Sequence, residues 1–261
     1  MAAVFRTSER NTMKKFRFDL LFLAIAVVCF GIYGAISYHN AALAKQAGAV
    51  RARIQEEYAP VRTAQEESVY QSPYAAVFAS NEDCIAWLNI PDTNIDYPVM
   101  QTMDDEEYYL YRNFFGEDDK NGTLFMDTDC DLGKERSNLI IHGHHMKSGA
   151  MFGSLEKYAD ADFCKAHSKI YLYTKDEVRT YEVLAAFQAK VYKNKTDKFR
   201  YYAYFGFDTA EQFDEYYDNI KRLSLYDTGV TAQFGDEILT LSTCAYHTKN
   251  GRFAVAAKRV E

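Results

Sequence analysis

An uninterrupted apolar run near the N-terminus restricts what this chain can fold into more than any other feature of its sequence. Nineteen residues without a charge, Leu20–Tyr38, follow a segment, 1–19, that holds five basic and two acidic side chains. At about 1.5 Å rise per residue, a helix of this length roughly spans the hydrocarbon core of a bilayer. Because basic residues stay on the cytoplasmic side, we predict a single-pass anchor over 20–38, a cytoplasmic segment over 1–19, and an extracellular remainder.

A cleaved signal peptide is the alternative interpretation of the same run. The sequence Ala-Leu-Ala at Ala42–Ala44 resembles a processing site. The apolar run is longer than the usual apolar region of a signal peptide, about 7–15 residues, which favours an uncleaved anchor. Both interpretations export the rest of the chain.

The exported part is acidic. The whole chain has a net charge of -7, and the first nineteen residues contribute +3, which leaves -10 for the remainder. Such a surface repels phosphate backbones and argues against a nucleic-acid partner. The cysteines beyond the apolar run show no CxxC pair and no regular spacing, so neither a disulfide framework nor a Cys/His metal site is predicted. These cysteines are Cys84, Cys130, Cys164 and Cys244.

Two regions of different pattern follow the anchor. Residues 39–80 are rich in Ala, Gln, Glu and Arg, with apolar residues at helical spacing, and we predict a helical stalk or linker there. Residues 81–261 contain about eight short runs rich in β-branched and aromatic residues, separated by turn residues, which predicts a β-barrel or sandwich. Two runs lie within Ile85–Gln101, and the others are Gly122–Asp127, Ser137–His145, Lys169–Thr174, Val178–Tyr192, Asp236–Cys244 and Arg252–Val260.

One helix is predicted among these strands, at Asp208–Tyr226. Asp208 and Glu211 have the spacing of a capping box. The helix either packs on the sheet or walls a binding groove, and its sequence does not distinguish the two. Its apolar residues fall on one face: Phe213, Tyr216, Tyr217, Ile220 and Leu223.

Cys244 and Arg252 have the chemistry and placement expected of an acyl-transfer site. Cys244 ends one predicted strand and Arg252 begins the next, so both side chains come to the same rim of the sheet. A thiol nucleophile needs a proton-transfer partner, usually His, and a donor for the oxyanion, which a guanidinium can supply. Strand alternation places His142 and His144 on one face at the end of another strand, and His145 on the other face.

Each of these residues also has a simpler interpretation. A single cysteine in a strand is often a small core residue, and Arg252 could pair with a surface carboxylate. The three histidines could bind a metal, but no Asp or Glu lies within the patch, and hydrolytic zinc sites often include a carboxylate. We therefore predict no metal and no cofactor.

Several segments together resemble the sortase family, and class B within it. The resemblance covers roughly residues 82–261 and implies a closed eight-stranded β-barrel with peripheral helices. It also implies that Cys244 is the nucleophile, His144 the proton-transferring histidine and Arg252 the arginine of the site. Class B members often have Tyr where this chain has His142, which leaves the role of His142 open. The segments are YPVMQ, GTLFMD, NLIIHGHHMKSGAMFGSLEKY and ILTLSTC, with Arg at the start of the next strand.

The resemblance implies a membrane-anchored cysteine transpeptidase. Such an enzyme cleaves the C-terminal sorting signal of a secreted protein after Thr and joins the acyl group to an amine of the cell wall or of a pilin. Its partners would be sorting-signal peptides, a cell-wall precursor amine and the membrane. An exported cysteine hydrolase that uses water as the acceptor is the alternative. The substrate-binding residues expected from the resemblance are Ser242, Thr243, Leu110 and Tyr202.

Overall fold

The computed structural model describes residues 2–58, 70–192, 198–245 and 248–261, with side chains from residue 22 onward. Part of the predicted linker, residues 59–69, lies outside the described residues. So does His247, in the connection between Cys244 and Arg252. The strands are β1 Cys84–Asn89, β2 Asp96–Met100, β3 Leu124–Met126, β4 Asn138–Gly143, β5 Lys169–Tyr173, β6 Val178–Lys190, β7 Ile238–Ala245 and β8 Gly251–Arg259. The helices are α1 Ala2–Glu57, α2 Ala75–Ser80, α3 Ala161–Ala166 and α4 Ala210–Leu223, with short 3₁₀ turns η1 Tyr108–Tyr111, η2 Leu155–Ala159 and η3 Tyr201–Ala203.

The eight strands form a closed barrel in the order β1-β2-β3-β4-β7-β8-β6-β5, with β5 pairing back to β1. Two pairs, β2 with β3 and β4 with β7, are parallel, and the others are antiparallel. Closure removes the exposed sheet edges that would otherwise pair with other chains. The prediction of a closed eight-stranded barrel with peripheral helices is confirmed.

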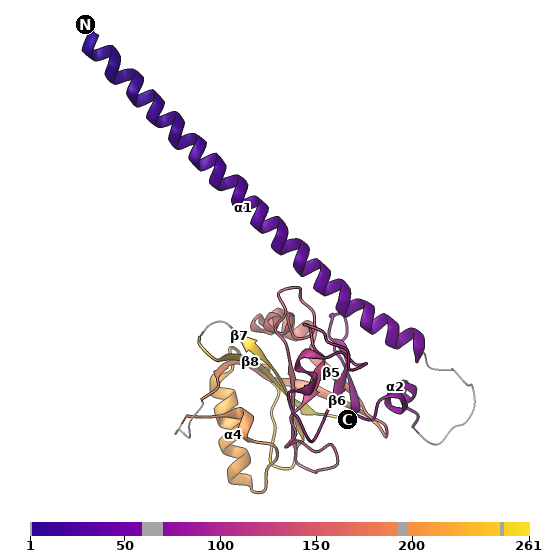
Figure 1. The fold of residues 1–261 in the computed structure, drawn as a ribbon. Helices are drawn as coiled ribbons and strands as arrows, with labels where there is room; N and C mark the ends of the chain where they lie inside the picture. Colours follow the sequence, from indigo (N-terminus) through magenta and orange to yellow (C-terminus); the bar gives the residue numbers. More distant parts are fainter. Residues whose placement is uncertain (1, 59–69, 193–197, 246–247) are drawn as a thin grey trace. The chain divides into compact units, whose positions relative to one another are not determined.

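Helix α4 packs against β6 through an apolar face, and it lies on the outside of the barrel (Figure 1). Phe213, Tyr216 and Ile220 of this face are buried, as the periodicity predicts. The predicted cap is wrong by one residue: the hydroxyl of Thr209 accepts the N–H of Gln212, and the Gln212 side chain accepts the N–H of Asp208. Thr209 is therefore the N-cap residue, and the Gln212 side chain bonds the residue before the cap rather than the cap itself, so the reciprocal pair of a capping box is not formed.

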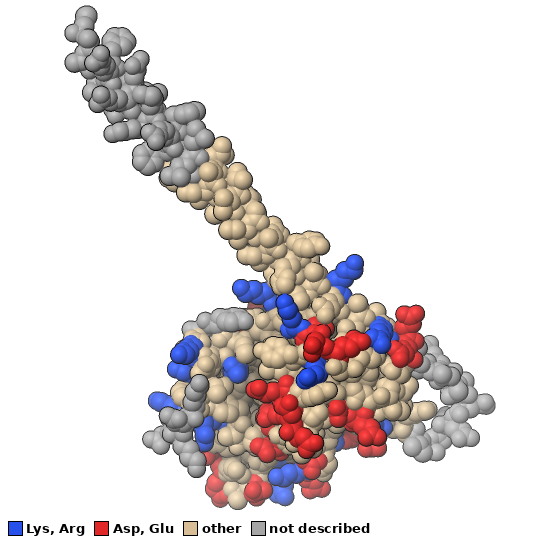
Figure 2. Space-filling model, in the orientation of Figure 1, with Lys and Arg blue, Asp and Glu red and all other residues tan. Residues whose placement is uncertain are grey.

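The folded unit begins at Leu43, well before residue 81. Ala47 and Ile54, near the C-terminal end of α1, are only 3% and 1% exposed. The Asn121 side chain donates a hydrogen bond to the Leu43 carbonyl, and Arg53 pairs with Glu117. The helix predicted as a stalk over 39–80 thus contributes two core residues, Ala47 and Ile54, to the folded unit. Figure 2 shows groups of acidic side chains on the face of this unit in view.

Residues 1–42 form a separate unit, the N-terminal part of α1. By length and composition, the stretch of α1 from Phe22 is able to cross a membrane, with a mean hydropathy of 1.8 in its most apolar window. This finding is compatible with the predicted anchor, and a signal sequence passes the same test.

Candidate active site

One cavity of about 290 Å³ lies where β4, β7 and β8 meet the segment around η1. Six of the seven residues selected from the sequence contribute to its wall: Cys244, His144, Arg252, Ser242, Thr243 and Leu110. The other described lining residues are Glu106, Glu107, Tyr111, Phe125, His142 and Gly143.

Cys244 and Arg252 face each other directly across two neighbouring strands. Cys244 on β7 is the register partner of Arg252 on β8, and both residues are half-buried. Side chains of directly opposed residues in a sheet leave it on the same face, with their Cβ atoms about 4.5–5.5 Å apart. A hydrogen bond of 3.1 Å from Arg252 Nη1 to the carbonyl of Gly251 helps to orient the guanidinium.

His144 enters the cavity immediately after β4 ends at Gly143. A Cβ at Gly143 would lie 2.5 Å from Leu124 Cδ2 and 2.7 Å from Phe152 Cδ2, so the close packing behind the strand end requires glycine. His144 Nε2 lies 2.7 Å from the carbonyl oxygen of Leu110. Burial lowers the pKa of His144 below its usual value, and the Leu110 carbonyl partly opposes that shift.

Ser242 and Thr243 use their hydroxyl groups within the fold. The two residues are 1% and 2% exposed. The hydroxyl of Thr243 donates to the carbonyl of Gly143 at 2.8 Å, which joins the ends of β4 and β7. The Ser242 hydroxyl lies 2.7 Å from the hydroxyl of Tyr201. These bonds brace the cavity wall beside Cys244.

Tyr202 lies outside the described lining of this cavity. Its hydroxyl accepts the backbone N–H of Tyr192 at 2.8 Å, and its ring packs edge-on against Tyr201. The neighbouring residue Tyr201 is also outside the described lining, but its hydroxyl bonds the lining residue Ser242. Burial raises the pKa of Tyr201 to about 12, and the Ser242 hydrogen bond and the Arg252 guanidinium oppose that rise. Because the two tyrosines are adjacent, the sequence did not indicate that Tyr201, rather than Tyr202, would contact Ser242.

Burial separates Cys244 from the three other thiols that follow the apolar run. All five cysteines are free, but Cys84 and Cys130 are buried, and burial raises the pKa of each to about 12. Burial also raises the pKa of Cys164. The reactive form of cysteine is the thiolate, so these three positions suit packing better than nucleophilic attack. Cys244 is half-buried and lines the cavity.

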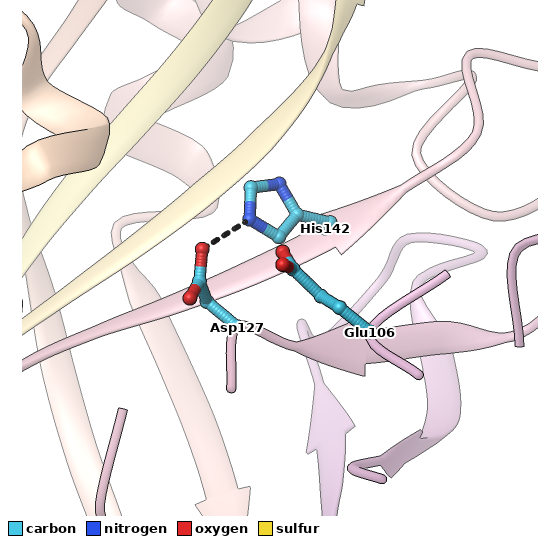
Figure 3. Close-up of side chains that lie close together, drawn as sticks. All are labelled: Glu106, Asp127 and His142. Carbon is cyan, nitrogen blue, oxygen red and sulfur yellow. Dashed lines mark hydrogen bonds and ion pairs between the residues drawn. The ribbon is translucent and has the colours of Figure 1, made fainter. Parts of the chain in front are cut away.

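An acidic group beside His142 was not anticipated from the sequence. His142 Nε2 lies 3.4 Å from Asp127 Oδ2, and the Glu106 side chain points toward the same position (Figure 3). Burial raises the pKa of Glu106, and the nearby Asp127 carboxylate adds to the rise. The histidine patch itself contains no carboxylate, whereas the fold brings these two to it from separate segments.

The comparisons with known proteins agree with this geometry. A family model described as the Sortase domain matches residues 88–260. Sortase B of Listeria monocytogenes is 37% identical over 69% of this chain and 71% of its own length, and sortase B of Staphylococcus aureus is 27% identical over 95% and 99%.

Solved structures similar to this chain are also sortase B structures. A sortase B structure from Bacillus anthracis, in complex with AAEK1, has a TM-score of 0.66 and 32% identity, and covers 80% of this chain and 94% of that one. A Staphylococcus aureus sortase B–substrate complex has a TM-score of 0.66 and 26% identity, with 83% and 94% covered.

The barrel, the cavity and these matches together define a cysteine transpeptidase, and the chain belongs to the sortase family. Within that family its curated relatives and structural neighbours are sortase B proteins, so it is a class B member. The family activity, anchoring of proteins to the cell wall by transpeptidation, follows from this membership.

Proposed function

We propose that this protein is a membrane-anchored transpeptidase in which Cys244, His144 and Arg252 carry out the reaction. It cleaves the C-terminal sorting signal of secreted proteins after Thr and transfers the acyl group to an amine of the cell wall or of a pilin. The observation that carries the proposal is that Cys244 and Arg252 are directly opposed and share one cavity with His144.

In the first step, the Cys244 thiolate attacks the carbonyl carbon of the signal's threonine. The carbonyl oxygen gains negative charge, and the Arg252 guanidinium donates hydrogen bonds to it. Removing one such donor from an enzyme typically costs about 10²–10³ in rate, which sets the scale expected for Arg252. The register of β7 and β8 supports this role because it puts the guanidinium on the face of the sheet that carries the thiol.

The scissile C–N bond then breaks, and the leaving amine takes a proton from the His144 imidazolium. A thioester between Cys244 and the threonine acyl group remains. The acceptor amine attacks this thioester, the C–S bond breaks, and the proton lost by the acceptor returns to the His144 imidazole. The hydrogen bond between His144 Nε2 and Leu110 holds the ring in one orientation and leaves Nδ1 free for these transfers.

The apolar part of α1 anchors the enzyme in the cell membrane, with 1–19 in the cytoplasm and the catalytic domain extracellular. The basic residues of segment 1–19 support this orientation. The acidic surface of the exported domain supports peptide and cell-wall partners over nucleic acid.

A fluorogenic sorting-signal peptide library, with and without an amine acceptor, tests the proposal on the full-length chain. A transpeptidase forms an amide with the amine, whereas an exported cysteine hydrolase gives only the free acid. We expect the amide to be the main product when amine is present. Free acid as the main product at saturating amine would contradict the proposal and favour the hydrolase.

A further inference from the structure

Three side chains from separate parts of the chain converge at one side of the catalytic cavity. Glu106 precedes η1, Asp127 follows β3, and His142 belongs to β4. One potential ligand atom of each lies within 4.8 Å of those of the other two (Figure 3). Glu106 and His142 also line the cavity that holds Cys244.

The fold holds two of these side chains in place. Asp127 Oδ1 accepts the N–H of Asp129 at 3.1 Å, and this bond leaves Oδ2 directed at His142. The imidazole of His142 packs against the ring of Phe125, with the centroids 5.4 Å apart. Asp127 itself is only 8% exposed. Glu106 is exposed and belongs to a loop, so it is the adjustable member of the group.

The distance between His142 and Asp127 fits two ligands of one metal ion better than a direct charge-assisted hydrogen bond. A charge-assisted hydrogen bond between an imidazolium and a carboxylate is about 2.7–2.9 Å long, shorter than the 3.4 Å observed between His142 Nε2 and Asp127 Oδ2. Two ligands about 2.0–2.1 Å from a tetrahedral metal lie about 3.3–3.4 Å apart. A neutral imidazole and two carboxylates carry a charge of -2, which a divalent cation balances.

We propose that Glu106, Asp127 and His142 bind a divalent cation of the zinc class at the side of the catalytic cavity. An imidazole nitrogen with two carboxylates is a ligand set suited to Zn²⁺. Ca²⁺ instead takes six to eight oxygen ligands, which these three side chains cannot supply.

Cation binding connects this site to the catalytic histidine through a short piece of chain. Glu106 lies four residues before Leu110, which belongs to η1. The Leu110 carbonyl accepts the hydrogen bond from His144 Nε2. A cation that fixes Glu106 to Asp127 and His142 therefore restrains the segment that orients His144. The site is a regulatory one: it controls how firmly His144 is held.

Calorimetric titration of the full-length chain in detergent with Zn²⁺ tests the proposal. The protein carries Cys29→Ser and Cys244→Ala, so that neither accessible thiol binds the metal. We expect one equivalent to bind with a micromolar or lower Kd. Asp127→Asn preserves the acceptor for Asp129, and His142→Phe preserves the ring on Phe125; each should weaken binding at least tenfold.

His167→Ala is the matched control, because His167 lies outside the cavity lining and contacts the Pro91 carbonyl. It should bind Zn²⁺ as the parent does. Absence of Zn²⁺ binding up to millimolar concentration, or equal binding by Asp127→Asn and His142→Phe, would overturn the site. Ca²⁺ binding as tight as Zn²⁺ binding would also contradict it, since the imidazole would then have no part.

Hydrogen exchange of the same protein tests the link to His144. Zn²⁺ should slow amide exchange in residues 102–112 of the parent and leave it unchanged in His142→Phe. Binding without any protection of this segment would overturn the proposed restraint of His144, although the metal site itself would stand.

Discussion

Cys244 on β7 and Arg252 on β8 are directly opposed register partners, so the barrel itself sets the position of the guanidinium relative to the thiol. The two strands are antiparallel neighbours along their whole length, from Ile238 opposite Lys258 to Ala245 opposite Gly251. Sites built on strands are held more firmly than sites on loops. His144, by contrast, lies just beyond a strand and depends on the Leu110 carbonyl for its orientation.

The first prediction concerns the geometry of the arginine. Arg252→Lys keeps the positive charge but replaces a planar fork of donors with a compact ammonium group. We expect kcat/KM to fall about 10²-fold in the peptide assay, the cost typical of one lost oxyanion donor. Arg259→Lys, on the same strand but outside the cavity lining, controls for a general effect on β8. Unchanged turnover in Arg252→Lys would exclude an oriented role for Arg252.

The second prediction compares two buried tyrosines, in order to separate an effect on the position of the active-site residues from an effect on the stability of the fold. Tyr201 bonds Ser242, and Tyr216 bonds Thr240, in each case on β7. Replacing either by Phe should cost about 1 kcal/mol of unfolding free energy, measured in urea. Only Tyr201→Phe should also lower kcat, because Tyr201 bonds Ser242, which lines the cavity beside Cys244, whereas Thr240 is not among the described lining residues. If both variants kept full kcat, Tyr201 would have a purely structural role.

The third prediction concerns Gly143, the glycine that precedes His144. In Gly143→Ala the new Cβ would overlap Leu124 and Phe152, and overpacking of this kind typically costs about 1–3 kcal/mol of stability. Gly48→Ala is the control, because a Cβ there meets nothing within 4 Å. It lies in a helix, and Ala should stabilise it by up to about 1 kcal/mol. Equal melting temperatures for the two variants would show that a Cβ at position 143 does not overlap its neighbours, and would contradict the prediction.

The fourth prediction is a pH dependence of stability that arises from His144. Its folded-state pKa is lowered, chiefly by burial, from an unfolded value of about 6.5. The unfolded chain therefore binds this proton more readily, and stability falls as the pH drops through about 6.5 toward the folded-state pKa. Urea unfolding between about pH 7.5 and 5 should show a smaller loss for His144→Gln than for the wild type. If the variant instead lost more stability than the wild type over this pH range, burial would not be lowering the pKa of His144, and the prediction would be contradicted.

Strand patterns and turn residues were enough to predict the barrel, because alternation and β-branched composition are local properties of the sequence. The opposition of Cys244 and Arg252 also followed from local order, since a strand, a short connection and the next strand return to the same rim. Nothing local distinguished a barrel from a sandwich; the resemblance to a known family made that choice.

Long-range contacts could not be predicted in the same way. The two carboxylates near His142 come from residues 106 and 127, and only the folded chain brings them together. Tyr201 reaches Ser242 across 41 positions, and Leu110 reaches His144 across 34. The helix after Leu43 has a pattern that suits a solvated stalk, yet Ala47 and Ile54 are buried. A weakly amphipathic helix does not reveal which surface it will meet.

Mass spectrometry of a trapped acyl-enzyme tests directly whether Cys244 is the nucleophile. The full-length protein is incubated with sorting-signal peptides, without amine, and then digested under acidic conditions that preserve a thioester. We expect the mass of a peptide acyl group ending in Thr on the fragment that contains Cys244, and no adduct in Cys244→Ala. An acyl group on Cys84, Cys130 or Cys164, or peptide cleavage by Cys244→Ala, would contradict it.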